Sequence, residues 1–142
     1  MEVQSYLFFD GRCEEALEFY SRAIDAEIET MMRFSQNPDG PAACGPDGAP
    51  MPPENMNKIM HAQFRVGKTA ILASDGMCTG KPTFQGVSLA ILVNDEDEAK
   101  RYFDALRDGG QVQMPLAKTF FSSAFGMVAD RFGVSWMVVA DE

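Results

Sequence analysis

Two segments of the chain carry apolar residues at helical spacing. Positions i, i+3, i+4 and i+7 are apolar over about 12–25, and the same spacing recurs between Asn94 and the Gly109-Gly110 pair. Asn94 is the expected N-cap of the second segment, the acidic run 95–98 fills its first turn, and the two glycines end it. The pattern therefore predicts two amphipathic helices.

Strand-like runs surround both predicted helices. These runs are rich in β-branched and aromatic residues, and Gly67-Lys68 forms a tight hairpin turn between two of them. The expected strands are 3–9, 27–34, 58–66, 69–74, 87–93, 111–114, 125–130 and 135–140. The order of one strand, one helix and three strands therefore occurs twice.

A comparison of the chain with itself supports duplication of one module. A shift of 83 residues superposes Glu15-Ala16 on Glu98-Ala99 within the two predicted helices. The matching order of elements supports the repeat more strongly than these few identities do. We expect one domain over 1–142, with module one at 1–75, a linker at 76–86 and module two at 87–142.

Residues 35–57 interrupt the pattern of module one. This segment holds most of the chain's eight prolines and has almost no periodicity. A connection of this length is unusual in a compact domain. The sequence leaves two interpretations open, a lid over a site and a mobile surface loop.

Composition and charge restrict the class of protein. The chain of 142 residues is 46% hydrophobic and 23% charged, which excludes disordered and fibrous proteins. Its net charge of −9 repels nucleic-acid phosphates and anionic lipid surfaces. No apolar run is long enough for a membrane span, and the N-terminus lacks a signal-peptide pattern. We expect a cytoplasmic protein with neither a nucleic-acid nor a membrane partner.

The cysteines indicate free thiols. Cys13, Cys44 and Cys78 lie far apart, and no CxxC pair occurs. An odd number of widely spaced cysteines predicts neither a disulfide framework nor a zinc site. We interpret them as small, reduced side chains.

Three stretches of the sequence resemble one known family. They are YLFFDGRCEEALEFY at 6–20, KIMHA at 58–62, and FG at 125–126 followed by DRFGVSW at 130–136. The family is the PhnB-like branch of the glyoxalase/bleomycin-resistance/dioxygenase superfamily, also called vicinal oxygen chelate proteins. The resemblance implies an α+β fold of two βαβββ modules, whose mostly antiparallel strands curl around an open cup. It also implies a homodimer.

The metal positions of that superfamily are occupied here by poor ligands. In its metal-binding branches each module contributes two ligands, and the resemblance places Ser5, Leu72, Ser88 and Met137 at these positions. None of them offers an imidazole, carboxylate or thiolate, and the chain has a single histidine. We therefore expect no metal and no other cofactor.

The branch also carries the label of a demethylubiquinone methyltransferase. The sequence gives no support to this activity, because no glycine-rich strand-to-helix turn of the kind that cradles a nucleotide-like cofactor occurs. The final motif also departs from the family's usual Asp-Pro-Phe-Gly, with Arg131 at the proline position.

His61 is the candidate for chemistry. It alternates with Ala62 along its strand, so it faces the cup if the apolar face packs under a helix. An imidazole there could act as a general base or bind a ligand, and a purely structural role is the alternative. The resemblance places Phe121 at the cup mouth, where its ring could hold an apolar ligand. Trp136 alternates with Met137, so we expect it beneath a helix if Met137 faces the cup. The predicted ligand-binding residues are Ser5, Leu7, His61, Leu72, Ser88, Phe121 and Met137.

The sequence therefore predicts a PhnB-like protein that binds a small, partly apolar molecule in its cup without a divalent metal. It leaves open whether the protein catalyses a reaction. Three alternatives remain: a metal-dependent lyase, isomerase or dioxygenase with relocated ligands that include His61, a resistance protein that sequesters an antibiotic, and a vestigial scaffold.

Overall fold

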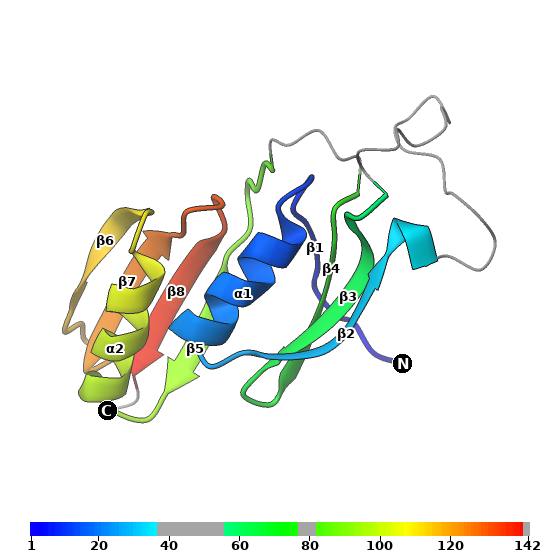
Figure 1. Ribbon diagram of the computed structural model, residues 1–142. Helices are drawn as coiled ribbons and strands as arrows, with labels where there is room; N and C mark the ends of the chain where they lie inside the picture. The colour runs from blue at the N-terminus through cyan, green and yellow to red at the C-terminus, as the bar shows by residue number, and fades with distance from the viewer. Residues whose placement is uncertain (37–55, 77–81, 141–142) are drawn as a thin grey trace. The chain divides into compact units, whose positions relative to one another are not determined.

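The computed structural model describes residues 1–36, 56–76 and 82–140 (Figure 1). In this part of the chain it contains two α-helices, one short 3-10 helix and eight strands. They fall into two compact units, residues 1–82 and 83–142. Each unit contains one strand, one helix and three further strands, so the predicted order of elements is confirmed.

The bounds of the elements lie close to those expected. Unit one contains β1 (Tyr6–Phe8), α1 (Cys13–Ala23), β2 (Glu27–Arg33), the 3-10 helix (Phe34–Gln36), β3 (Ile59–Val66) and β4 (Thr69–Ser74). Unit two contains β5 (Leu89–Val93), α2 (Glu96–Leu106), β6 (Gln111–Ala117), β7 (Ala124–Ala129) and β8 (Ser135–Ala140). β1 and β5 begin later than predicted, and β6 is longer. Most of the proline-rich segment, residues 37–55, and residues 77–81 of the predicted linker lie outside the described residues.

Each unit has its own mixed sheet of four strands. The strand order is β1-β4-β3-β2 in unit one and β5-β8-β7-β6 in unit two. In each unit the first strand along the chain pairs in parallel with the last one along the chain, β1 with β4 and β5 with β8. The other neighbouring strands are antiparallel. The sheets are open, with two edge strands each. The α+β class and the repeated module are thereby confirmed.

The two helices preserve the repeat seen in the sequence. The shift of 83 residues carries the bounds of α1 onto those of α2, and it superposes the fully buried Ala16 on the fully buried Ala99. One detail of the prediction is wrong, because Asp95 and not Asn94 caps α2. The Asp95 carboxylate accepts a hydrogen bond from the Glu98 amide at 2.8 Å. A cap one residue later satisfies an amide of the first turn that Asn94 does not reach.

The core of unit one lies between α1 and one face of its sheet. The Tyr20 ring of α1 packs against Phe9 and Phe64, with centroids 6.1 and 5.8 Å apart. Ala62 on β3 and Ala73 on β4 complete this buried face. Because side chains alternate along a strand, the residues next to Ala62 and Ala73 in the chain point to the opposite face of the sheet. His61 belongs to that opposite face, as predicted.

The core of unit two is built around Trp136. Its indole is buried, and Nε1 donates a hydrogen bond to the Asp130 carboxylate at 2.8 Å. The same carboxylate accepts the amides of Phe132 and Val134 at 2.9 and 3.1 Å. The predicted structural position of Trp136 is confirmed.

Arg131, at the position where the family usually has proline, holds the end of α2. Its guanidinium donates to the main-chain oxygen of Asp108 at 3.2 and 3.1 Å, and it also pairs with the Asp108 carboxylate. The side chain extends past Gly109, whose φ is +78°. A cation at a helix C-terminus complements the carbonyl groups there. Among the described residues, no helix is long and apolar enough to cross a membrane.

Candidate functional site

Five side chains of unit one form a surface that we call the His61 face: Tyr6, Phe8, Met32, His61 and Leu72. β1 contributes Tyr6 and Phe8, and the sheet register places Tyr6 opposite Leu72 and Met32 opposite His61. Paired residues in neighbouring strands share a face of the sheet. The five side chains therefore lie together on the face of the sheet opposite α1.

The tyrosine and the histidine of this face are joined by a hydrogen bond. Tyr6 Oη lies 3.1 Å from His61 Nδ1, with ring centroids 5.9 Å apart. The Tyr6 ring also stacks on Phe8, at 4.9 Å and an interplanar angle of 26°. Tyr6, Phe8 and Met32 are 39%, 53% and 41% exposed. Exposed rings around one imidazole suit a planar, partly apolar molecule that carries a polar group.

A close backbone approach holds the Phe8 ring. A Cβ at Gly76 would lie 2.8 Å from Phe8 Cδ1, and the φ of Gly76 is +51°, so glycine meets both demands. The Gly76 amide also donates to Ser74 Oγ at 3.1 Å, and Ser74 pairs with Phe8 across the sheet. The turn after β4 thus packs directly against the His61 face.

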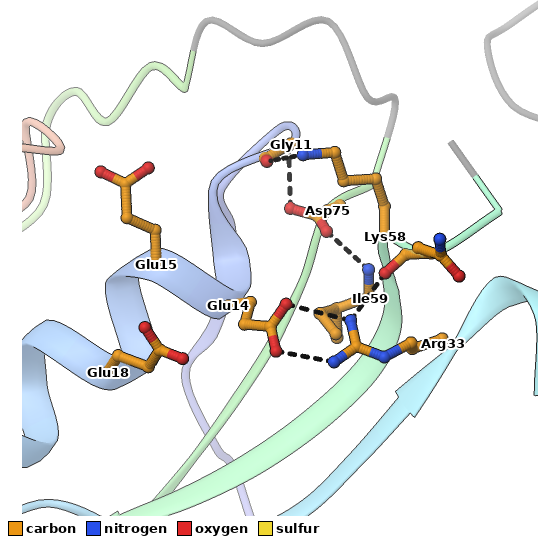
Figure 2. Close-up of a pocket in the computed structure, with 9 residues that line it drawn as sticks. Gly11, Glu14, Glu15, Glu18, Arg33, Lys58, Ile59 and Asp75 are labelled. Carbon is orange, nitrogen blue, oxygen red and sulfur yellow. Dashed lines mark hydrogen bonds and ion pairs between the residues drawn. The ribbon is translucent and has the colours of Figure 1, made fainter. Parts of the chain in front are cut away.

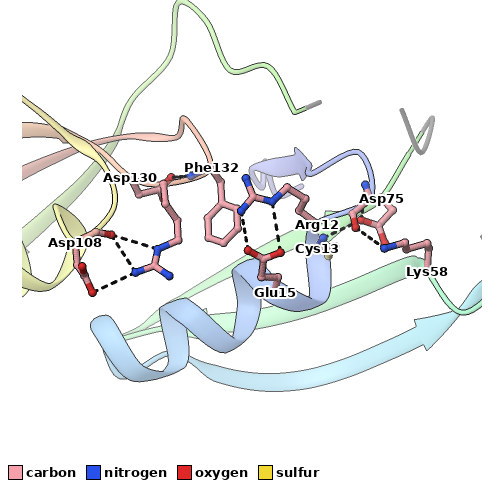
Figure 3. Close-up of polar contacts among 10 residues, drawn as sticks. Arg12, Cys13, Glu15, Lys58, Asp75, Asp108, Asp130 and Phe132 are labelled. Carbon is pink, nitrogen blue, oxygen red and sulfur yellow. Dashed lines mark hydrogen bonds and ion pairs between the residues drawn. The ribbon is translucent and has the colours of Figure 1, made fainter. Parts of the chain in front are cut away.

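Asp75 links the three chain segments that support this face; Figure 2 shows its bonds to Gly11 and Ile59, and Figure 3 shows it beside Cys13. Its carboxylate accepts the amides of Gly11 and Cys13 at 2.8 Å each, and the amide of Ile59 at 2.6 Å. Asp75 is 1% exposed. It therefore caps the start of α1 and joins that turn to the beginning of β3, two residues before His61.

A separate polar pocket of about 420 Å³ lies beside the start of α1 (Figure 2). The Arg33 guanidinium forms a forked ion pair with Glu14, at 2.6 and 3.0 Å, and Lys58 Nζ donates to the main-chain oxygen of Gly11 at 2.8 Å. The hydrogen bond from Arg33 holds the pKa of the Glu14 carboxyl below its usual value. Both cations of the pocket are therefore already engaged with the protein.

Cys13 is unsuited to nucleophilic chemistry. Burial raises the pKa of its thiol far above the usual range, and the nearby Asp75 and Glu14 carboxylates raise it further. A thiol that stays protonated is inert toward electrophiles. Cys13 is a free, buried cysteine, as expected from the sequence, whereas Cys44 and Cys78 lie outside the described residues.

The structure brings only part of the predicted site of unit one together. Leu72 lies on the His61 face. Leu7 does not, because it is 6% exposed and shares the buried face with Phe9. Ser5 precedes β1, and its main-chain oxygen accepts the Leu72 amide at 2.9 Å. The residue opposite Leu72 is Tyr6. Side chains alternate along a strand, so a buried Leu7 puts its neighbours Tyr6 and Phe8 on the opposite face. This alternation is the signal in the sequence that could have identified Tyr6 and Phe8 as residues of the site.

The predicted residues of unit two lie at separate places on its sheet, with Ser88 near the start of β8 and Phe121 near its end. Ser88 Oγ lies 2.7 Å from Ser135 Oγ, and Met137 is half-buried on the face opposite Trp136. Phe121 is half exposed and makes an edge contact with Phe125, at 5.2 Å between centroids. The ligand-binding role of these residues stays a prediction.

The side chains at the superfamily's metal positions do not fit a divalent ion. Hydroxyl, isobutyl and thioether groups supply no strong donor to a divalent ion. This holds whether Ser5 or Tyr6 is taken as the ligand position of the first strand. Within residues 1–36, 56–76 and 82–140, no group of three His, Cys, Asp or Glu side chains is placed to hold a metal ion. No step that depends on a metal follows from this geometry.

Solved structures define the class of this fold. The chain matches a glyoxylase/bleomycin resistance protein/dioxygenase domain from Frankia sp. EAN1pec with a TM-score of 0.63 at 13% identity, over 99% of this chain and 95% of that one. Protein PA1353 from Pseudomonas aeruginosa matches with a TM-score of 0.82 at 37% identity, over 99% and 98%. The chain therefore has the fold of a glyoxylase/bleomycin resistance protein/dioxygenase domain.

The particular family follows from the sequence match. A family model described as 3-demethylubiquinone-9 3-methyltransferase matches residues 1–139, and the chain belongs to this PhnB-like family. It is 34% identical to Protein YjdN of Escherichia coli K12, over 97% of this chain and 94% of that protein. A putative 3-demethylubiquinone-9 3-methyltransferase, PhnB protein, from Bacillus cereus matches with a TM-score of 0.77 at 27% identity, over 99% of both chains. The resemblance read from the sequence is confirmed.

Proposed function

We propose that this protein binds a small, planar, partly apolar molecule on the His61 face without a divalent metal. The observation that carries the proposal is the Tyr6–His61 hydrogen bond, set among exposed apolar side chains. Phe8 and Met32 flank this polar pair on the same face. The face therefore combines an apolar platform with one hydrogen-bonding centre, which is the usual composition of a small-molecule site.

Family membership does not by itself supply an activity. The family description names a methyl transfer, whereas the connection from β1 to α1 contains one glycine, Gly11, and the connection from β5 to α2 contains none. Neither connection is the glycine-rich turn that holds a nucleotide-like cofactor. We therefore propose binding and assign no reaction.

The affinity for a fragment-sized probe is expected to be weak but measurable. A bicyclic probe such as indane or 1-indanone covers part of the platform, so its Kd is roughly millimolar. Stacking on one aromatic ring contributes about 0.5–1.5 kcal/mol, so Phe8→Ala weakens binding by about 2- to 12-fold.

The test is an NMR titration of the full chain with both probes. Methyl-labelled methionine and the imidazole of the single histidine serve as reporters, and Met32→Leu assigns the Met32 signal. We expect saturable shifts at His61 and Met32. The matched control is Leu92→Ala, an exposed apolar side chain on β5 of unit two, which leaves the affinity unchanged. Absence of saturable shifts, or equal weakening by Phe8→Ala and Leu92→Ala, contradicts the proposal.

A second arm examines the metal. Protein treated exhaustively with EDTA is expected to bind both probes with unchanged affinity. Calorimetry with Ni²⁺, Zn²⁺, Mn²⁺ and Fe²⁺ is expected to show no stoichiometric micromolar binding. Loss of probe binding after chelation, with recovery on adding one of these ions, refutes the metal-free part of the proposal.

A further inference from the structure

We infer that Tyr6 determines which nitrogen of His61 carries the ring proton, and that His61 thereby selects ligands with a carbonyl oxygen. This inference rests on the proposed function of the His61 face. The contact that carries it joins Tyr6 Oη to His61 Nδ1 at 3.1 Å. A neutral imidazole has one donor and one acceptor nitrogen, so a partner at Nδ1 decides what Nε2 offers.

The phenol is the donor in this hydrogen bond. A phenol O–H is a more acidic donor than an imidazole N–H, and an imidazole nitrogen is a more basic acceptor than a phenol oxygen, so O–H···N is the favoured direction. Stacking on Phe8 orients the Tyr6 ring. His61 Nδ1 accepts this proton, and the ring hydrogen of His61 therefore lies on Nε2.

The Nε2–H group of His61 is then a donor available to a ligand. Within residues 1–36, 56–76 and 82–140, no side chain or main-chain oxygen accepts from it. The flanking Phe8 and Met32 are uncharged and apolar. A planar apolar frame with one acceptor oxygen, as in an aryl ketone, matches both properties, whereas the corresponding hydrocarbon matches only the platform.

The experiment compares two probes that differ by one carbonyl, 1-indanone and indane. The measured quantity is the ratio of their affinities, because this ratio cancels changes in the apolar platform. Loss of one neutral hydrogen bond lowers the ketone-to-hydrocarbon ratio by about 2- to 12-fold, and we expect this change in His61→Phe. His61→Gln keeps an amide N–H near the Nε2 position and is expected to retain part of the ratio. Tyr6→Phe lowers the ratio partway, because both protonation patterns are then populated.

Nitrogen NMR of the imidazole tests the role of Tyr6 independently. The chain has one histidine, so both imidazole nitrogen signals belong to His61, and their couplings to the ring carbon-bound protons distinguish Nδ1 from Nε2. At pH 8.5 we expect a protonated Nε2 and an unprotonated Nδ1 in the wild-type protein, and a mixture in Tyr6→Phe.

Three results overturn the inference. A protonated Nδ1 in the wild-type protein reverses the direction of the hydrogen bond. An unchanged affinity ratio in His61→Phe, while both probes still bind, removes the selection of a carbonyl but leaves the proposed function intact. Failure of both probes to bind refutes the proposed function and this inference together.

Discussion

Asp75→Asn replaces the carboxylate that joins α1, β3 and β4. In the native protein this group is buried and accepts the amides of Gly11, Cys13 and Ile59. An asparagine has one acceptor oxygen, which can keep the two amides on the α1 side. Its NH2 group then faces the Ile59 amide, and two donors oppose each other without an acceptor.

The expected loss of stability follows from this count. One buried amide without an acceptor costs about 1–3 kcal/mol, and the two remaining bonds lose the strengthening that a charged acceptor provides. We expect Asp75→Asn to lower the free energy of unfolding by about 2–4 kcal/mol, a large fraction of the roughly 5–15 kcal/mol typical of a folded domain.

Urea unfolding followed by far-UV circular dichroism measures the loss. Asp97→Asn is the matched control, because it removes the same charge from an exposed site in α2 and lowers stability by about 1 kcal/mol or less. Hydrogen exchange should also accelerate at the Gly11, Cys13 and Ile59 amides. A difference below about 1 kcal/mol between the two variants refutes the assignment of Asp75 as the link between these segments.

Three further predictions concern turns and ion pairs. Gly76→Ala is expected to destabilise more than Gly67→Ala in urea unfolding. Both positions have positive φ, a strain of about 1–2 kcal/mol, but only the first meets another atom at 2.8 Å; equal losses contradict this reading. Arg131→Ala should cost about 0.5–1 kcal/mol by exposing the end of α2, and Arg131→Lys should recover part of it; no loss in calorimetry refutes this. Because Arg33 lowers the pKa of Glu14 on folding, the pair stabilises above the ordinary glutamate range. The stability difference between wild type and Glu14→Gln should shrink as the pH falls through that range and vanish below it, at the lowered pKa of Glu14; a pH-independent difference contradicts the pairing.

Several features of this protein could be read from local periodicity. A repeat of 3.6 residues marks a helix, and alternation marks a strand, so the order of elements and both helices followed from the sequence. The face occupied by His61 followed from its alternation with Ala62. These patterns depend on neighbours a few positions away, and tertiary packing preserved them.

The supporting contacts of the site could not be read in this way. Asp75 reaches Gly11 across 64 residues, and Tyr6 reaches His61 across 55. No local pattern encodes which distant donor a buried carboxylate will meet. The sequence predicted that a strand ends at residue 74, and only the folded chain shows what the Asp75 side chain after it binds.

The faces of β1 show the same division. The sequence alone determined that a strand precedes α1 and that the chain repeats one module. Only the tertiary structure decided that Leu7 packs with Phe9 in the core and that Tyr6 lies beside His61. The physical reason is that a shift of one residue in strand register moves every side chain to the other face, and the pairing with β4, more than sixty residues away in the chain, sets that register.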